Sequence, residues 1–284
     1  MQQIEDLWKQ VDEMVEKTDF NGLWNGFEPV AFAIYDKEKV YLWNHPDNLD
    51  DNITFFPWNP QFSGDDLIFY RDYPTAIVST DHYPEIDSLY PRLMHELFRG
   101  YQFLLGEARF PDTWAGFRYP IYLDAIDLKI KERVCLHDAC MEEDAAVKEK
   151  KIFEFISFRN RRTRLIKEFA AYEFSLETVR GPASYVQFKA HSRFSRNAER
   201  TLLNQYTSIL FEQGQSLFHL KKSCACSGML MCFLLDALYR NWQFSFMRSE
   251  KSLYDFFCDS LYSLEHRGFS ALKNPSPVMR QIGK

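Results

Sequence analysis

The segment 90–105, YPRLMHELFRGYQFLL, carries polar residues at helical spacing within an apolar run. His95, Arg99 and Gln102 stand at positions i, i+4 and i+7, which places them on one face of a helix. Glu96 lies about 100° round that helix from His95. An imidazole can bind a metal ion, and a carboxylate beside it can take a proton from a metal-bound water. Such residue types can carry hydrolytic metal chemistry, in which His95 would be a ligand and Glu96, only if the protein is active, the general base.

A second segment with a polar stripe follows at 169–188, FAAYEFSLETVRGPASYVQF. Its apolar residues recur every three or four positions, as on the buried face of a helix: Phe169, Tyr172, Leu176, Val179, Ala183 and Val186. The polar stripe beside them consists of Glu173, Glu177, Arg180 and Ser184. We predict a second helix here, whose polar stripe could supply further site residues.

Both segments resemble parts of the gluzincin metallopeptidases, the aminopeptidase-like branch of the zincins. The stretch VRGPASYVQ is similar to their Asn-Glu-Gly-x-Ala-x-Tyr-Val-Glu sequence, and MHELFRGYQ to their His-Glu-Leu-Phe-His-x-x-Gln helix. The preceding strand and acidic linker, and the later run CSGMLMCFLLDALYRNWQFSF, extend the resemblance over roughly residues 75–245. It implies a zincin-like core in which His95 is the first zinc ligand and position 180 the third.

The two remaining ligand positions depart from the family pattern, because Arg99 stands in place of the second His and Arg180 in place of the Glu. A guanidinium has five donors and no acceptor, so it cannot bind zinc. We therefore expect no metal and no other cofactor. We hypothesise instead that Arg99 and Arg180 fill the vacated cavity as an ionic cluster with Glu96 and with Glu173 or Glu177. Further residues expected in this cleft are His95, Gln102 and Tyr185.

The leading interpretation is a metallopeptidase-like protein without peptidase activity, whose cleft serves binding or regulation. The arginine pair then predicts a peptide or another carboxylate as ligand. One alternative is an active zinc peptidase with rearranged ligands, for example His95 with Glu173 or Glu177. Another is an interaction protein with a vestigial cleft, and a helical protein unrelated to zincins also stays open. On that last reading Arg180 would be an ordinary solvated side chain.

Composition and charge narrow the class of protein. The chain has 284 residues, of which 46% are hydrophobic and 17% aromatic, which is typical of a well-packed globular protein. A net charge of −6 argues against nucleic acid or an acidic membrane surface as partner. The N-terminal sequence carries interspersed acids unlike a signal peptide, and no segment approaches 18 uncharged apolar residues. We expect a soluble, cytoplasmic protein.

The elements that must position these residues follow from periodicity. The N-terminal segment has apolar residues at helical spacing: Ile4, Leu7, Val11, Met14 and Val15. The runs EPVAFAIYD and KVYLWNHP predict a β-hairpin, and PTAIVST, 74–80, another strand. Residues 44–75 are rich in Asn, Asp and Pro, which predicts a long irregular connection. From about residue 85 the pattern is helical. The fold class is therefore α+β and predominantly helical, with a β-containing part at 1–84 and a helical body at 85–284.

Two further groups of residues could bind ligands. Cys135, His137 and Cys140 lie close together in the chain, as do Cys224 and Cys226, but neither group has paired zinc-ligand spacing. We expect free, buried thiols. The run FRNRRTRLIK concentrates five basic residues between Arg159 and Lys167, for which we expect a solvated helix face.

Overall fold

The computed structural model describes residues 4–48, 53–120, 122–211 and 219–265. These residues form an α+β protein that is mostly helical, at 62%, with a five-stranded mixed sheet in its N-terminal part followed by helices. The predicted fold class is confirmed at this level. Contacts divide the described residues into two compact units. The first lies within Met1–Glu107 and Val186–Ser195, and the second within Ala108–Tyr185 and Arg196–Lys284.

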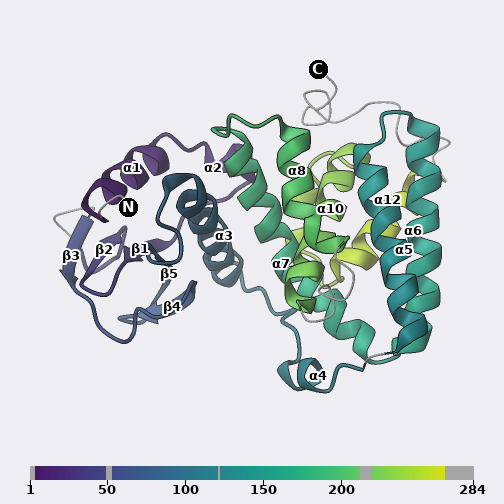
Figure 1. Ribbon diagram of the computed structural model, residues 1–284, viewed down its shortest axis with the longest axis horizontal. Helices are drawn as coiled ribbons and strands as arrows, with labels where there is room; N and C mark the ends of the chain where they lie inside the picture. Colours follow the sequence, from purple (N-terminus) through teal and green to yellow (C-terminus); the bar gives the residue numbers. More distant parts are fainter. Residues whose placement is uncertain (1–3, 49–52, 121, 212–218, 266–284) are drawn as a thin grey trace. The chain divides into compact units, whose positions relative to one another are not determined.

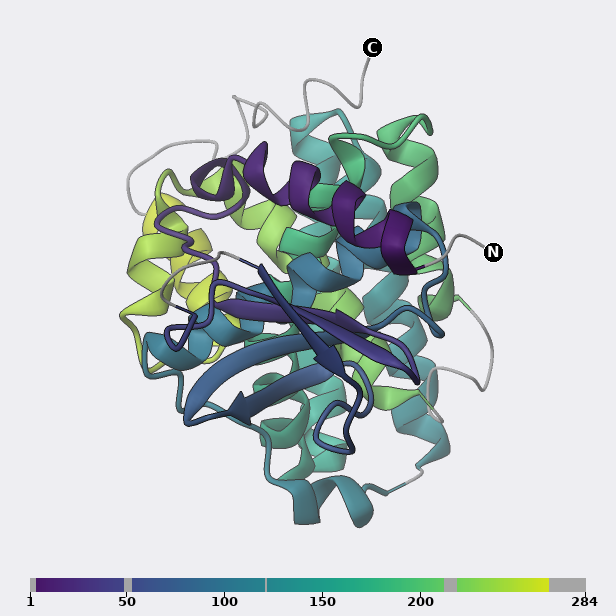
Figure 2. The same ribbon diagram turned by 90° about the vertical axis from the view of Figure 1, so that its left-hand side faces the viewer.

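The first unit contains the sheet, whose strands can be followed in Figure 2. The strand order is β3-β2-β1-β5-β4, and only the central pair β1 and β5 is parallel. The strands are β1 (Ala31–Tyr35), β2 (Lys39–Trp43), β3 (Ile53–Pro57), β4 (Asp66–Tyr70) and β5 (Tyr73–Ser79). The central strands are buried on both faces, which explains their near-continuous apolar sequences.

The predicted hairpin is confirmed as β1 and β2, in antiparallel register with Phe32 opposite Trp43. The carboxylate of Asp36 shapes its turn by accepting hydrogen bonds from the backbone N–H groups of Glu38 and Lys39. The prediction of an irregular connection over 44–75 is wrong for the described residues in this range, because β3 and β4 form there. Both are short edge strands whose apolar residues are largely not buried, as Phe55 in β3 shows at 72% exposure. Residues 49–52 lie outside the described residues.

Three helices belong to the same unit: α1 (Ile4–Glu16), α2 (Phe20–Leu23) and α3 (Ile86–Leu104). The predicted N-terminal helix is confirmed, with Ile4, Leu7 and Val11 buried. The predicted helix at 90–105 is confirmed as part of α3, which packs along the sheet and contacts β5 and β4. The boundary was predicted at residue 84, before α3, whereas contacts group α3 with the sheet in the first unit.

The second unit is helical, with α5 and α6 lying side by side (Figure 1). Asp144 begins α6 by accepting hydrogen bonds from the N–H groups of Ala146 and Val147. The predicted second helix is confirmed as α7, which continues through Pro182 and contributes to both units. The helices are α4 (Thr113–Phe117), α5 (Leu123–Met141), α6 (Ala145–Ile166), α7 (Phe169–Ser192), α8 (Glu199–Thr207), the 3-10 helix η1 (Ser208–Leu210), α10 (Leu220–Leu238), α11 (Trp242–Met247) and α12 (Leu253–Glu265).

The backbones of α7 and α10 meet at two glycines. A Cβ atom added to Gly181 would lie 2.6 Å from the Cα of Gly228, and one added to Gly228 would lie 2.7 Å from the carbonyl oxygen of Glu177. Any side chain at either position would therefore force the two helices apart. This close approach explains why glycine stands at both positions.

Among the described helices, none combines the length and the apolar character needed to cross a lipid bilayer.

Candidate functional site

The polar face of α3 begins with His95, which is buried in the first unit. Its apolar neighbours Leu93 and Leu97 anchor the helix in the core. The Nδ1 atom of His95 lies 3.1 Å from Oε1 of Gln187 on α7. Gln187 follows Arg180 by two helical turns along α7. The α7 residue that contacts His95 is therefore Gln187, which the sequence pattern did not single out as a site residue.

Glu96 is completely buried and both of its carboxylate oxygens are in ion pairs. Nη1 of Arg99 donates to Oε2 at 2.6 Å, and Nη2 of Arg92 lies 2.5 Å from Oε1. Arg99 Nη1 also bonds to Oδ1 of Asp66 on the edge strand β4, at 2.5 Å. Arg92 in turn donates to the backbone oxygen of Asp65. We call Arg92, Glu96, Arg99 and Asp66 the α3 clamp.

The α3 clamp determines what Glu96 can do chemically. Burial raises the pKa of Glu96 above its ordinary value, and the charges of Arg99 and Arg92 reduce that rise without cancelling it. Burial alone would lower the pKa of Arg99, but the carboxylates of Glu96 and Asp66 outweigh it, so the guanidinium stays charged. A general base needs an accessible lone pair within reach of the water it activates. In this arrangement both oxygens of Glu96 are engaged by cations.

Gln102, the third residue of the predicted polar face, is buried at 1% exposure. Its side-chain amide makes no hydrogen bond to any other residue in the described part of the chain. It therefore lies on the predicted face without joining the α3 clamp.

The carboxylates of α5 and α7 form a separate cluster inside the second unit. Glu132 accepts from Nε and Nη2 of Arg162, at 2.9 and 2.8 Å, and from Nη2 of Arg159 at 3.2 Å. Both guanidinium groups and Glu132 are at most 1% exposed. With Lys129, Glu173 and Glu177 these residues make up what we call the buried ionic cluster.

Glu173 and Glu177 complete the buried ionic cluster from α7. Glu173 accepts from Lys129 at 2.6 Å, from Arg162 at 2.7 Å and from the Tyr119 hydroxyl. Glu177 binds both terminal nitrogens of Arg159, each at 2.7 Å, and accepts from Ser227. All four carboxylate oxygens are thus engaged. Bidentate Arg–carboxylate pairs of this kind fix the register between neighbouring helices.

The basic run 158–167 was predicted to be a solvated helix face, and this is wrong for two of its residues. Arg159 and Arg162, one turn apart on α6, are fully buried, whereas Arg161, Arg164 and Lys167 are exposed. The buried pair points at carboxylates on α5 and α7, which neutralise its charge. The i, i+3 spacing alone does not distinguish a solvated stripe from one that faces acidic residues on other helices.

The hypothesis gave Arg99 and Arg180 carboxylate partners, and the structure corrects some of these partners. Arg99 pairs with Glu96, as predicted, and with Asp66. Glu173 and Glu177, predicted as partners of Arg180, bind Lys129, Arg162 and Arg159 instead. Arg180 is half-buried. Burial raises the pKa of the Tyr172 hydroxyl, and the charge of Arg180 opposes that rise without cancelling it. The hydroxyl of Tyr185 donates to Asp236 at 2.6 Å within the helical unit.

The donor set does not fit a zinc site of the kind that the resemblance implies. His95 offers one imidazole, while Arg99 and Arg180 have no lone pair to give. Within residues 4–48, 53–120, 122–211 and 219–265, no three His, Cys, Asp or Glu side chains form a group that could hold a metal ion. The cysteines are free, as predicted, and Cys135, Cys140, Cys224 and Cys226 are buried. Burial raises the pKa of Cys224 and Cys226 to about 12, so both are neutral thiols.

The buried ionic cluster predicts acid sensitivity. Burial would raise the pKa of Glu173, but Arg162 and Lys129 outweigh it and hold this pKa well below the ordinary 4.5. A depressed carboxyl pKa contributes stability that is present above the unfolded value and is lost as the pH falls below it. We therefore expect the free energy of unfolding to fall as the pH is lowered below about 4.5. Urea unfolding between pH 7 and pH 3 measures this.

The variant Glu173→Gln isolates the contribution of that carboxyl. It should be less stable than the wild type at pH 7 and should lose less stability on acidification, so that the two curves converge at low pH. Parallel curves would contradict the prediction.

Several residues that complete these two sites were not identified from the sequence: Asp66, Arg92, Lys129, Glu132, Arg159, Arg162 and Gln187. The i, i+4 spacing of Arg92 and Glu96 is a local signal that could have been read. Asp66 lies on a different strand and has no such signal. Comparison with family models, with curated proteins and with solved structures gives no match for this chain.

Proposed function

We propose that this chain is a metallopeptidase-like protein without catalytic activity, in which arginines have replaced zinc. The observation that carries the proposal is the α3 clamp. Glu96, the residue that would serve as general base, has one carboxylate oxygen bound to Arg99 and the other paired with Arg92. A cation at the position of a lost metal ligand balances the buried carboxylate that the metal would have balanced.

The order of elements supports a common origin with zincins. A sheet strand, β5, leads into α3 with His95 and Glu96, and a later helix, α7, brings a side chain to within hydrogen-bond distance of His95. The residue at that contact, Gln187, is the one that matches the terminal Glu of the family sequence. We infer that the direct contact between His95 and Gln187 now links α3 to α7, as a zinc ion bound by both helices would have done.

The alternative of an active zinc peptidase needs Glu173 or Glu177 as a ligand. Both carboxylates are fully occupied by Arg159, Arg162 and Lys129. Releasing one of them would leave a buried guanidinium or ammonium without its partner, which is strongly unfavourable. A carboxylate ligand on Arg99 would likewise have to displace Glu96 and Asp66. These contacts favour the non-catalytic proposal.

Restoring the ligands tests the proposal. In a tetrahedral zinc site neighbouring ligand atoms are roughly 3.3 Å apart. His95 Nδ1 and Gln187 Oε1 are 3.1 Å apart, so Gln187→Glu places a carboxylate close to a suitable position. We expect the double variant Arg99→His/Gln187→Glu to bind about one zinc per chain, because it adds two ligands beside His95. The wild type should bind none, as measured by metal analysis after dialysis.

The matched comparison is Arg99→His/Arg180→Glu, which follows the sequence resemblance instead of the contact between His95 and Gln187. It should bind less zinc than the variant carrying Gln187→Glu. Tightly held zinc in the wild type would overturn the proposal, and so would a failure of both double variants to gain any metal while remaining folded by circular dichroism.

A further inference from the structure

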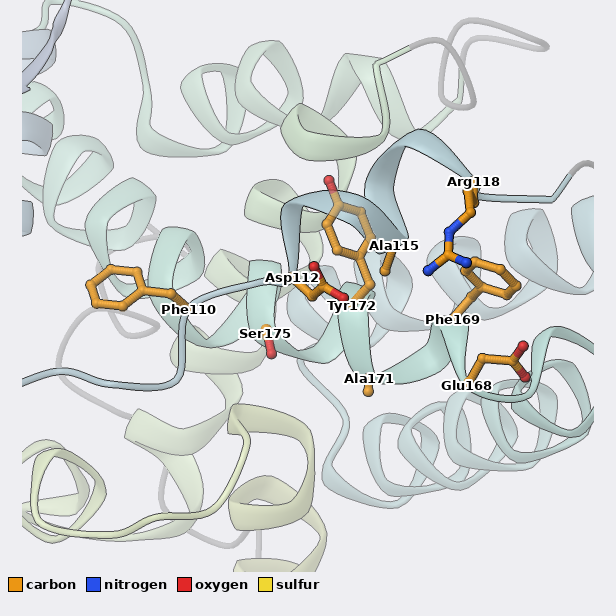
Figure 3. A pocket seen from close by; sticks show the side chains of 9 residues that line it. All are labelled: Phe110, Asp112, Ala115, Arg118, Glu168, Phe169, Ala171, Tyr172 and Ser175. Carbon is orange, nitrogen blue, oxygen red and sulfur yellow. The ribbon is translucent and has the colours of Figure 1, made fainter.

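A cavity of about 330 Å³ opens between the α4 segment and the start of α7, wholly within the second unit. Figure 3 shows the side chains that line it. They are Phe110, Asp112, Ala115 and Arg118 from the α4 segment, and Glu168, Phe169, Ala171, Tyr172 and Ser175 from α7 and the residue before it. The volume suits a ligand of the size of a dipeptide. None of these residues belongs to the α3 clamp or to the buried ionic cluster.

The lining combines apolar surface with charges of both signs. Aromatic rings come from Phe110, Phe169 and Tyr172. The carboxylate of Asp112 and the guanidinium of Arg118 both come from the α4 wall of the cavity, and Ala115 lies between them (Figure 3). A ligand that matches this arrangement has a cation at one end, an anion at the other and an apolar body.

The wall that carries these charges is built from specific contacts. Asp112 begins α4, and its Oδ1 accepts from the backbone N–H of Trp114 at 2.9 Å. The absence of a side chain at Gly116 lets α4 approach Tyr172, since a Cβ atom there would lie 2.5 Å from the Tyr172 hydroxyl.

Tyr119 then ties the end of the α4 segment to the helical body. Its hydroxyl donates to Glu173 of the buried ionic cluster, and its ring contacts those of Phe169 and Tyr172. The cavity is therefore largely pre-formed, which reduces the ordering that a ligand would have to impose.

We propose that this cavity binds a short apolar peptide with free termini. The ammonium group pairs with Asp112, the terminal carboxylate pairs with Arg118, and the apolar side chains pack on Phe110, Phe169 and Tyr172. Glu168, near the Arg118 side in Figure 3, adds a second carboxylate that disfavours purely anionic ligands. The inference does not rest on the proposed function, because the cavity shares no residue with the α3 clamp or with the contact between His95 and Gln187.

Isothermal titration calorimetry of the full chain with the dipeptide Phe-Leu tests the proposal. For a ligand of this size we expect a dissociation constant on the order of 0.1 mM. N-acetyl-Phe-Leu removes the cation and Phe-Leu amide removes the anion, so each should bind about tenfold more weakly. Equal binding of all three peptides would overturn the assignment of the charges, and no binding of Phe-Leu would overturn the site.

Variants locate the binding. Arg118→Gln should weaken Phe-Leu about tenfold and leave its amide unaffected, because only the carboxylate contact is lost. Asp112→Asn keeps a residue that can cap α4 and should weaken only peptides with a free ammonium. Ala171→Phe fills the cavity from an exposed helix position and should abolish binding.

The matched control is Arg164→Gln, which removes the same charge from an exposed site on α6 that does not line this cavity. It should bind Phe-Leu like the wild type. Unchanged binding in both Arg118→Gln and Ala171→Phe, with folding verified by circular dichroism, would place the peptide elsewhere and contradict the proposal.

Discussion

Replacing Glu132 by alanine should lower the free energy of unfolding by about 3–5 kcal/mol, the range found when one partner of a buried ion pair is removed. Glu132 is fully buried and accepts hydrogen bonds from both Arg159 and Arg162. Without it, Arg159 and Arg162 each lose one of their two carboxylate partners while they stay buried, which leaves excess positive charge in the interior. Urea denaturation followed by circular dichroism measures the change.

Asp127→Ala provides the control on the same helix. Asp127 makes an i, i+4 ion pair with Lys131, and both side chains are more than half exposed. Its removal should change the free energy of unfolding by about 0.5 kcal/mol or less. If Glu132→Ala is destabilised no more than this exposed variant, the buried ionic cluster is not the structural core that its contacts indicate.

The second large effect is expected at the helix contact between α7 and α10. An exposed Gly→Ala change in a helix stabilises it by about 1 kcal/mol, because alanine loses less backbone freedom on folding. At Gly228 the sign should reverse. The new Cβ atom would lie 2.7 Å from both the Glu177 carbonyl oxygen and the Gly181 Cα, and neither is a flexible side chain that could move aside. We expect Gly228→Ala to destabilise the protein by about 2–3 kcal/mol.

Thermal and urea unfolding of Gly228→Ala should be compared with Lys222→Ala, an exposed position in the first turn of α10. The control alters helix propensity without touching α7 and should stay within about 0.5 kcal/mol of the wild type. A stabilised Gly228→Ala variant would mean that α7 and α10 are further apart than the structure places them.

The elements predicted correctly are those whose signal is local. The hairpin follows from two apolar runs around a charged turn, and α3 and α7 from apolar residues at 3.6-residue spacing. The strands β3 and β4 were missed because edge strands need only one paired neighbour and tolerate exposed or polar residues. In the segment that contains them, Asn, Asp and Pro outweigh the short β-type runs.

The candidate sites were predicted only in part, for a similar reason. Helical spacing identified His95 and Glu96 together with Arg99, because these residues share one turn of α3 and the ion pair between the last two is local. Which residue of α7 contacts His95 depends on the point along α7 at which the two side chains meet, and helical spacing does not give that point. A sequence resemblance indicated Arg180, and the structure brings Gln187 there, two helical turns further along α7.

The buried arginines show that the charge pattern of a single helix does not predict which of its residues are buried. Arg159 and Arg162 have the spacing of a solvated stripe, and only the acids on α5 and α7 determine that they are buried. Those acids lie on other helices, 11 to 30 residues away in the sequence. Five basic residues in one run therefore predicted exposure, which holds for three of them and fails for two.

The discontinuous make-up of the first unit has a consequence for synthesis on the ribosome. Chain segment 186–195 supplies Gln187 to His95, Phe194 to the ring of Tyr90 and Arg193 to the backbone of Asp19. Because chains emerge from the N-terminus, the sheet and α3 must wait for all of 108–185 to be translated before these contacts can form. When the nascent N-terminal part leaves the exit tunnel, the first unit is therefore still incomplete, and His95 still lacks its neighbour Gln187.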